Sequence, residues 1–213
     1  KKGIIEGHKE TDRKRRLPIR MASMNKVKSV EELIAWIYST LKVSSVSNDI
    51  DHVKLVVTPK YNGISLLYDV SYDNVYTRGD GTFGQICTDH FFKMNKNIIN
   101  NDLSDVSCIV GEAIIPIKIW EEKFKGKMSI SGLPYKLNNA TVAGLFNCDE
   151  PSDVLDSVVF MKYKTTQDYL DKYEQLDYLN ELSEYSVPYL VLNPIDIVEH
   201  EYILDKFFKE CSK

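Results

Sequence analysis

The chain has 213 residues, of which 43% are hydrophobic and 27% charged, a composition typical of a folded globular protein and not of a disordered or collagen-like chain. No apolar run approaches the roughly 18 residues needed to cross a membrane, and no charged-then-apolar leader stands at the start. We therefore expect an intracellular protein without a membrane partner. The cysteines form no C-x-x-C pair and the histidines no H-x-x-x-H pair, so we expect no protein-held metal site.

The net charge of −4 is unevenly distributed along the chain. Residues 1–28 hold ten Lys or Arg against three Asp or Glu, whereas the remainder holds 17 against 28. We therefore separate a basic N-terminal segment, residues 1–28, from a main domain, residues 29–213. A basic segment on an acidic body is typical of proteins that contact nucleic acid or an acidic partner, and a solvated tail is the alternative interpretation.

The pattern of apolar residues predicts a mixed succession of helices and strands. Residues 29–32, Ser-Val-Glu-Glu, have the form of a capping box, and apolar residues at helical spacing continue to about Leu41. In order, we then expect strands at 53–58, 64–70, 75–77 and 107–115, a helix at 117–124, a strand at 158–163, a helix at 170–182, a strand at 189–192, and a last helix opened by Asp196 and Glu199. Strands in the middle with helices at both ends indicate an α+β domain.

Lys60 stands at the end of a predicted strand, in the stretch Pro-Lys-Tyr-Asn-Gly of residues 59–63. A lysine is a nucleophile only as the free amine, so a catalytic lysine needs its pKa lowered from about 10.4 by burial or by neighbouring cations. The alternative is a solvated lysine beside an Asn-Gly turn.

Two further stretches could hold a ligand. Residues 77–84, Thr-Arg-Gly-Asp-Gly-Thr-Phe-Gly, contain three glycines that let the backbone approach a ligand closely, and Arg78 can bind a phosphate or carboxylate with its forked guanidinium. The alternative is a glycine-rich surface loop. Glu112 interrupts an apolar strand, so its carboxylate must be paired, hydrogen-bonded or facing a cleft, unless this is an edge strand with Glu112 in solvent.

Together and in this order, these stretches resemble the adenylation (nucleotidyltransferase) domain of the NAD-dependent DNA ligases. Residues 60–63 match the family's Lys-x-Asp-Gly motif, and residues 77–84 reproduce its T-R-G-D-G-T-x-G signature in full. Gly111-Glu112 matches a strand that bears Gly-Glu, residues 21–26 are similar to the segment M-x-S-L-[DN]-[NK], and residues 160–163 resemble the aromatic strand that flanks the adenine. The resemblance implies an α+β nucleotidyltransferase fold of the ATP-grasp-like ligase adenylation type, with antiparallel sheets flanked by helices.

The resemblance also implies a chemistry. Lys60 would be the catalytic nucleophile, attacking the α-phosphate of NAD, or of ATP, in the presence of Mg²⁺ to form lysyl-AMP. AMP would then pass to the 5′-phosphate of nicked DNA, and the 3′-hydroxyl would displace it to seal the nick, as in DNA replication and repair. The implied nucleotide-binding residues, besides Lys60, are Ser23 and Met24 at the adenine edge, Arg78 on ribose or phosphate, Glu112 on the ribose and Tyr163 stacked on the adenine.

The chain departs from the family pattern at several points. Asn62 replaces the motif's aspartate, and Thr58 stands where a glutamate usually touches adenine. The family's later motifs and its OB-fold do not follow Lys213, so we expect a domain that is incomplete at the C-terminus and a second ligase subunit as partner, as in a split phage or viral ligase in the cytoplasm of a bacterium or an infected host cell. The alternatives are a non-catalytic nucleotide- or DNA-binding ligase subunit, and RNA end-joining or capping chemistry.

Overall fold

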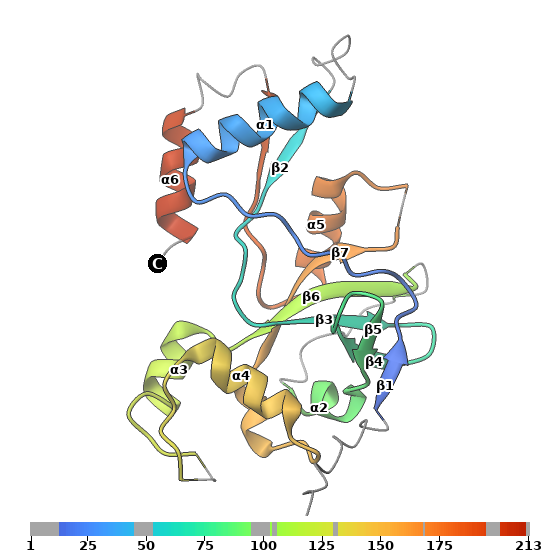
Figure 1. Cartoon of the computed structure of the whole chain (residues 1–213), viewed down its shortest axis with the longest axis vertical. Coiled ribbons are helices and arrows are strands. Elements are labelled where there is room, and N and C mark those ends of the chain that lie inside the picture. The colour runs from blue at the N-terminus through green and yellow to red at the C-terminus, as the bar shows by residue number, and fades with distance from the viewer. Residues whose placement is uncertain are drawn as a thin grey trace, which may run out of the picture.

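The computed structural model describes residues 13–44, 53–94, 103, 106–129, 132–167, 169–194 and 201–211, and it is an α+β fold with antiparallel sheets (Figure 1). Within these residues the largest sheet has four antiparallel strands. Their order across the sheet is β4 (Asn74–Thr77), β3 (Ile64–Asp69), β6 (Cys108–Ile114) and β7 (Val159–Thr165). None of the helices in the described ranges is long and apolar enough to cross a membrane.

Strand β6 lies at the centre of this sheet and is covered on both faces. Six of its seven residues are buried, which explains the apolar run around Gly111. A Cβ on Gly111 would lie 2.4 Å from the carbonyl oxygen of Met161, so glycine lets β7 approach this closely. The pairing of β6 with β3 places Ser65 directly opposite Glu112.

One face of the sheet carries the main core, under four short helices. They are α2 (Thr88–Lys93), α3 (Ile117–Lys123), α4 (Asn138–Asn147) and the 3₁₀ helix η3 (Asp153–Ser157). Leu66 and Ile109 of the sheet pack in this core with Phe91 of α2 and Phe146 of α4. The edge near β7 is covered by α5 (Lys172–Glu181), which begins with a capping box between Asp171 and Glu174.

A smaller layer lies at the opposite end of the molecule. Strands β2 (Leu55–Val57) and β8 (Leu190–Leu192) form an antiparallel pair, which α1 (Val30–Ser44) and α6 (Glu201–Cys211) cover (Figure 1). The apolar stripe predicted for α1 is the face that packs here, since Leu33 and Ile37 are buried with Leu192 and Leu204.

The described part of the basic segment lies against the four-stranded sheet. Strand β1 (Lys14–Arg16) pairs with β5 (Phe83–Gln85), the strand at the end of the glycine-rich stretch. Leu17 and Met21 are buried against Leu67 and Val110, on the sheet face opposite the main core. Residues 13–28 therefore run along the body of the protein and lead directly to the region of Lys60 (Figure 1).

The predicted elements are present, with ends that differ by a few residues, apart from the start of the last helix at Asp196 and Glu199, which lies outside the described residues. The sequence pattern missed β1, β5, α2, α4 and the 3₁₀ helix η3. All of them except α4 have three to six residues, too few to show a period, and α4 has no side-chain N-cap and only weak amphipathicity.

Candidate nucleotide-binding site

A cavity of about 360 Å³ opens where the start of β3, the middle of β6, β7 and the first residues of the glycine-rich stretch meet. We call it the site cavity. It brings together all but one of the residues that the sequence nominated: Ser23, Met24, Lys60, Asn62, Arg78, Glu112 and Tyr163. The exception, Thr58, lines a second cavity of about 470 Å³, which shares Met24 and Lys60 with the first.

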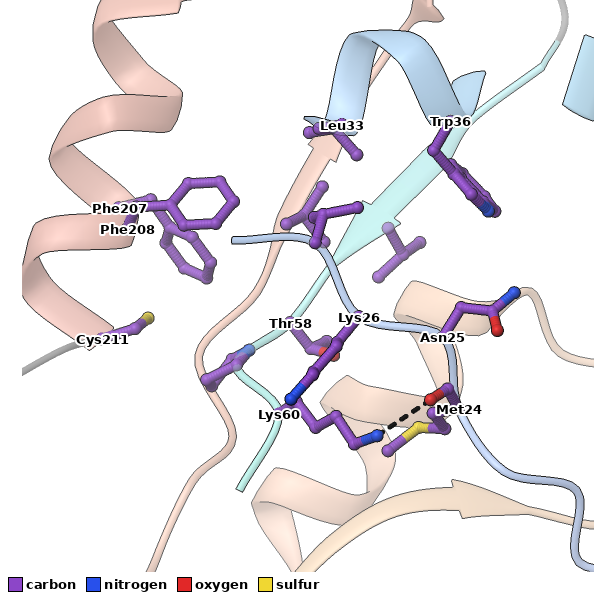
Figure 2. A pocket seen from close by; sticks show the side chains of 14 residues that line it. Met24, Asn25, Lys26, Leu33, Trp36, Thr58, Lys60, Phe207, Phe208 and Cys211 are labelled. Atoms are coloured by element: carbon purple, nitrogen blue, oxygen red, sulfur yellow. Dashed lines mark hydrogen bonds between the residues drawn. The ribbon is translucent and has the colours of Figure 1, made fainter. Parts of the chain in front are cut away.

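Lys60 lies between the two cavities, on the short connection from β2 to β3. Its side chain is exposed, and its Nζ donates a hydrogen bond to the carbonyl oxygen of Met24 at 2.9 Å (Figure 2). Beyond this contact the second cavity is largely apolar, with Leu33 and Trp36 from α1 on one wall and Phe207 and Phe208 from α6 on another (Figure 2). The amine of Lys60 is thus held at the boundary between a polar and an apolar cavity.

Glu112 is only 8% exposed, in the central strand of the sheet. The alternative of an edge strand with this carboxylate in solvent is therefore wrong. Oε1 accepts a hydrogen bond from the backbone N–H of Gly63 at 3.1 Å, and Oε2 accepts one from Ser65 Oγ at 2.7 Å. Burial raises the pKa of Glu112, against the lowering effect of these two hydrogen bonds and of the Arg78 and Lys60 charges.

Ser65 is a site residue that the sequence did not nominate. Its hydroxyl donates to Glu112, and its carbonyl oxygen accepts the N–H of Arg78 at 2.9 Å, so one residue fixes two others. A signal was present in the sequence, because Ser65 is a polar residue in an otherwise aliphatic stretch and lies two positions after Gly63, hence on the same face of the strand.

Tyr163 closes the cavity from β7. Its ring is partly buried, and it packs with both Leu67 on the sheet face and Met161 beside it. Burial, and to a lesser extent the charge of Glu112, raise the pKa of Tyr163 to about 12. The phenol is therefore neutral at physiological pH, and Tyr163 lines the cavity as an uncharged aromatic residue with a polar hydroxyl.

The glycine-rich stretch is mainly a structural turn. Only Thr77, Arg78 and Gly79 line the site cavity. Gly79 has φ +53° and Gly81 φ +91°, where a side chain would be strained, and a Cβ on Gly81 would lie 2.6 Å from the carbonyl oxygen of Met21. The expectation that all three glycines allow a ligand to approach is corrected: all three allow close contact with the protein's own backbone, since a Cβ on Gly79, Gly81 or Gly84 would lie within 2.6 Å of a backbone carbonyl oxygen, and only Gly79 also lines the cavity.

The same turn holds the segment that carries Ser23 and Met24. Oδ1 of Asp80 accepts the N–H groups of Thr82 and Phe83 at 2.8 and 2.7 Å, which closes the turn. The carbonyl oxygens of Thr82 and Gly81 then accept the N–H groups of Leu17 and Met21 at 2.9 and 3.0 Å. The turn therefore positions the backbone on the Met24 side of the cavity as well as Arg78.

Asn62 is exposed at the rim of the site cavity. Its Oδ1 accepts a hydrogen bond from Nδ2 of Asn139 at 3.3 Å, which links the rim to α4. Asn139 was not among the nominated residues. Its position in the sequence gave no indication of this contact.

The charges of the cavity favour an anionic ligand. Lys60 and Arg78 face it, and Glu112 supplies the single carboxylate among the described residues that line it. The described residues also contain no cluster of three or more side chains able to hold a metal ion. A phosphate would therefore meet two cations and a carboxylate that already accepts two hydrogen bonds here.

Comparison with known proteins gives weak but consistent matches. No protein-family model matches the chain. It is 31% identical over 108 residues to a DNA ligase of Shewanella baltica, covering 50% of this chain and 16% of that protein, and 33% identical over 122 residues to a DNA ligase of Psychromonas ingrahamii, covering 54% and 18%.

A third match extends over almost all of the chain. It is a DNA ligase of Acanthamoeba polyphaga mimivirus, 26% identical over 202 residues, which covers 94% of this chain and 30% of that protein. The chain thus spans less than a third of the length of these relatives. The three matches support a relationship between this chain and the DNA ligases.

Proposed function

We propose that this chain is the adenylation part of a DNA ligase, a nucleotidyltransferase that forms a lysyl-AMP intermediate on Lys60. The observation that carries the proposal is the site cavity itself, in which Lys60, Arg78, Glu112 and Tyr163 meet from four separate segments. A set of residues that is dispersed in sequence and gathered at one cavity is what a nucleotide site requires.

In the first step the free amine of Lys60 attacks the α-phosphorus of the donor. The P–N bond forms, the P–O bond to the leaving group breaks, and the amine loses a proton to solvent. Nicotinamide mononucleotide leaves if the donor is NAD, and pyrophosphate leaves if it is ATP. Arg78 stabilises the negative charge on the phosphoryl oxygens, and the hydrogen-bonded Glu112 is placed to accept from a ribose hydroxyl.

In the later steps AMP is transferred onward. An oxygen of a DNA 5′-phosphate attacks the phosphorus of lysyl-AMP, the P–N bond breaks, and Lys60 regains its proton. The 3′-hydroxyl of the nick then attacks the activated phosphate, and AMP leaves. Because the chain spans at most 30% of its relatives, the groups for these steps that it lacks would come from further sequence or from a partner subunit.

Mg²⁺ fits this cavity only as an ion carried by the donor's phosphates. Mg²⁺ usually keeps several waters and takes one or two carboxylates besides phosphate oxygens. Glu112 is the one carboxylate lining the cavity among the described residues, and both its oxygens already accept hydrogen bonds. We therefore assign no protein-held metal and no step to a resident ion.

The test is the intact mass of the protein after incubation with Mg²⁺ and either NAD or ATP. A gain of one AMP with one donor would support the proposal and identify the donor. Lys60→Ala should abolish the gain, and so should Lys60→Arg, which keeps a cation able to bond the Met24 carbonyl but has no nucleophilic amine at neutral pH. Lys136→Ala, at an exposed lysine outside the cavity, is the matched control. An adduct that persists in Lys60→Ala would refute the assignment.

A non-catalytic ligase subunit is the second candidate. Asn62 favours it, because an amide that bonds Asn139 stands where the ligase motif has an aspartate beside the nucleophile. On this hypothesis the chain binds nucleotide or DNA without forming an adduct, with or without a partner chain.

A further inference from the structure

Strand β1 presents a charged face that the proposed chemistry does not use. Lys14 and Arg16 are two residues apart and therefore project from the same side of the strand. Their partners in β5 are Gln85 and Phe83, whose side chains share that side. We call Lys14, Arg16, Phe83 and Gln85 the β1 face.

The β1 face is exposed and held in place. Lys14 and Arg16 are exposed, and the Phe83 ring is 42% exposed. Backbone bonds fix the strand at both ends, from Ile86 N to the carbonyl oxygen of Arg13 and from Leu17 N to that of Thr82, both at 2.9 Å. Two cations on a rigid, solvent-facing strand are not the solvated tail considered from the sequence.

The chemistry of the face matches a nucleic acid. The Nζ of Lys14 lies 5.7 Å from the centre of the Phe83 ring, so the face combines cations with an exposed aromatic ring. Cations that neutralise phosphates are typical of surfaces that bind nucleic acid, and an exposed ring beside them can pack against the sugars of the backbone. The nearby carboxylate, Asp80, competes weakly, since its Oδ1 already accepts two backbone N–H groups.

The spacing of the two cations on β1 also matches the spacing of phosphates along a DNA strand. Residues two apart on a strand lie about 7 Å apart along the backbone, which is twice the axial spacing of about 3.4 Å between phosphates on one DNA strand. The eight residues from Leu17 to Met24 connect the face to the carbonyl that holds Lys60. Fully extended they would span at most about 29 Å, less than the roughly 34 Å of one helical turn of DNA.

We propose that the β1 face contacts the phosphate backbone of duplex DNA within one helical turn of the nick that Lys60 serves; the proposal rests on the proposed function for the position of the nick. It predicts that the face contributes to DNA affinity through charge and leaves the chemistry at Lys60 unchanged.

The experiment measures binding of a fluorescein-labelled nicked duplex by anisotropy, from about 50 to about 200 mM salt. The slope of log K against log salt is negative, and each lost phosphate contact lowers its magnitude by about 0.9, so Lys14→Gln/Arg16→Gln should lower that magnitude by about 1.8 and weaken binding at low salt. The single variants Lys14→Gln and Arg16→Gln should each lower it by about 0.9 and guard against a folding defect in the double variant. The control is Lys118→Gln/Lys136→Gln, which removes the same charge from two exposed lysines, one in α3 and one between α3 and α4.

The outcomes separate this proposal from the proposed function. Three results would overturn the β1 face as a DNA contact. They are unchanged salt slopes in the β1-face variants, an equal loss of slope in the control pair, and a wild-type chain that binds poly-glutamate but not DNA. The AMP adduct, measured by mass on the same variants, should be unaffected. If the AMP adduct forms and the salt slopes are unchanged, the proposed function is supported and the β1-face proposal is refuted. If the slopes are reduced in magnitude and no adduct forms, the β1-face proposal is supported for a non-catalytic subunit.

Discussion

Replacing Ser65 by alanine tests whether the hydrogen bonds around Glu112 matter for the chemistry. The variant removes the hydroxyl that donates to Glu112 at 2.7 Å and leaves the backbone bond from Arg78 to the Ser65 carbonyl in place. A hydrogen bond to a charged group contributes about 1.5 to 3 kcal/mol. If that energy is expressed fully in positioning the carboxylate, the rate of AMP adduct formation at low donor concentration should fall roughly 10- to 150-fold, because each 1.4 kcal/mol is a factor of ten.

The pH dependence gives the second readout. Burial raises the pKa of Glu112 and the Ser65 hydrogen bond is the leading effect that lowers it, so Ser65→Ala should move the acid limb of adduct formation to higher pH. Ser65→Thr retains a hydroxyl and should restore both the rate and the limb. Single-turnover mass measurements across the acid range would provide both values. A lowered melting temperature with an unmoved acid limb would show that Ser65 is merely structural and refute the reasoning.

Three further predictions concern the turn, the rim and the core. Gly81→Ala should lower the free energy of unfolding by at least about 1 to 2 kcal/mol, because φ is +91° and the new Cβ would lie 2.6 Å from the Met21 carbonyl oxygen, whereas Gly144→Ala, in α4 with no neighbour within 4 Å, should be neutral or stabilising in the same urea titration. Asn62→Asp should keep the contact with Asn139, leave the adduct yield unchanged and speed its loss on addition of 5′-phosphorylated nicked DNA; equal loss rates would contradict this. Burial lowers the pKa of Lys162 from 10.5 to about 8, so between these values the unfolded chain binds more protons than the folded one and the free energy of unfolding should rise with pH. Lys162→Met should remove that rise with pH and stabilise the protein near pH 7 by up to about 3 kcal/mol. A Met variant that is less stable than the wild type at that pH would show that the hydrogen bond from Lys162 to the Leu182 carbonyl contributes more than burying the lysine charge costs.

The sequence pattern by itself could indicate Lys60, Arg78 and Glu112, because each of them is unusual among its neighbours, whereas Ser23, Met24 and Tyr163 were nominated only through the resemblance to the ligase family. Glu112 is an acid in an apolar run, and Lys60 and Arg78 stand beside glycine-containing turns. The sequence could not indicate the pairing of strands that brings these residues together. The register that sets Ser65 opposite Glu112 joins strands about 47 residues apart, and such non-local pairing is decided by the whole sheet rather than by local pattern.

The role of the glycine-rich stretch was misjudged for a related reason. Glycine density is equally consistent with a loop that holds a ligand and a loop that packs tightly on its own chain, and only the folded backbone around the three glycines decides between them. The three-residue strands β1 and β5 escaped prediction because their stability comes from backbone bonds to each other and between the residues that flank them, Arg13 with Ile86 and Leu17 with Thr82, and not from a buried side-chain stripe.

Taken together, the contacts at Met24 connect recognition to reactivity. The Met24 carbonyl holds the Lys60 amine, and an exposed hydrogen bond of this kind is worth only about 0.5 to 1.5 kcal/mol net. An incoming phosphate offers Lys60 a full negative charge and can displace that carbonyl. On the proposed function the same backbone lies at the edge of the adenine. Binding of the adenine and release of the Lys60 amine from the Met24 carbonyl would then both act on this one backbone segment. The β1–β5 pair and the glycine turn hold that segment from the other side, which on the proposed function would make the Thr-Arg-Gly-Asp-Gly stretch a determinant of where the Lys60 nucleophile points as well as of where the phosphate binds.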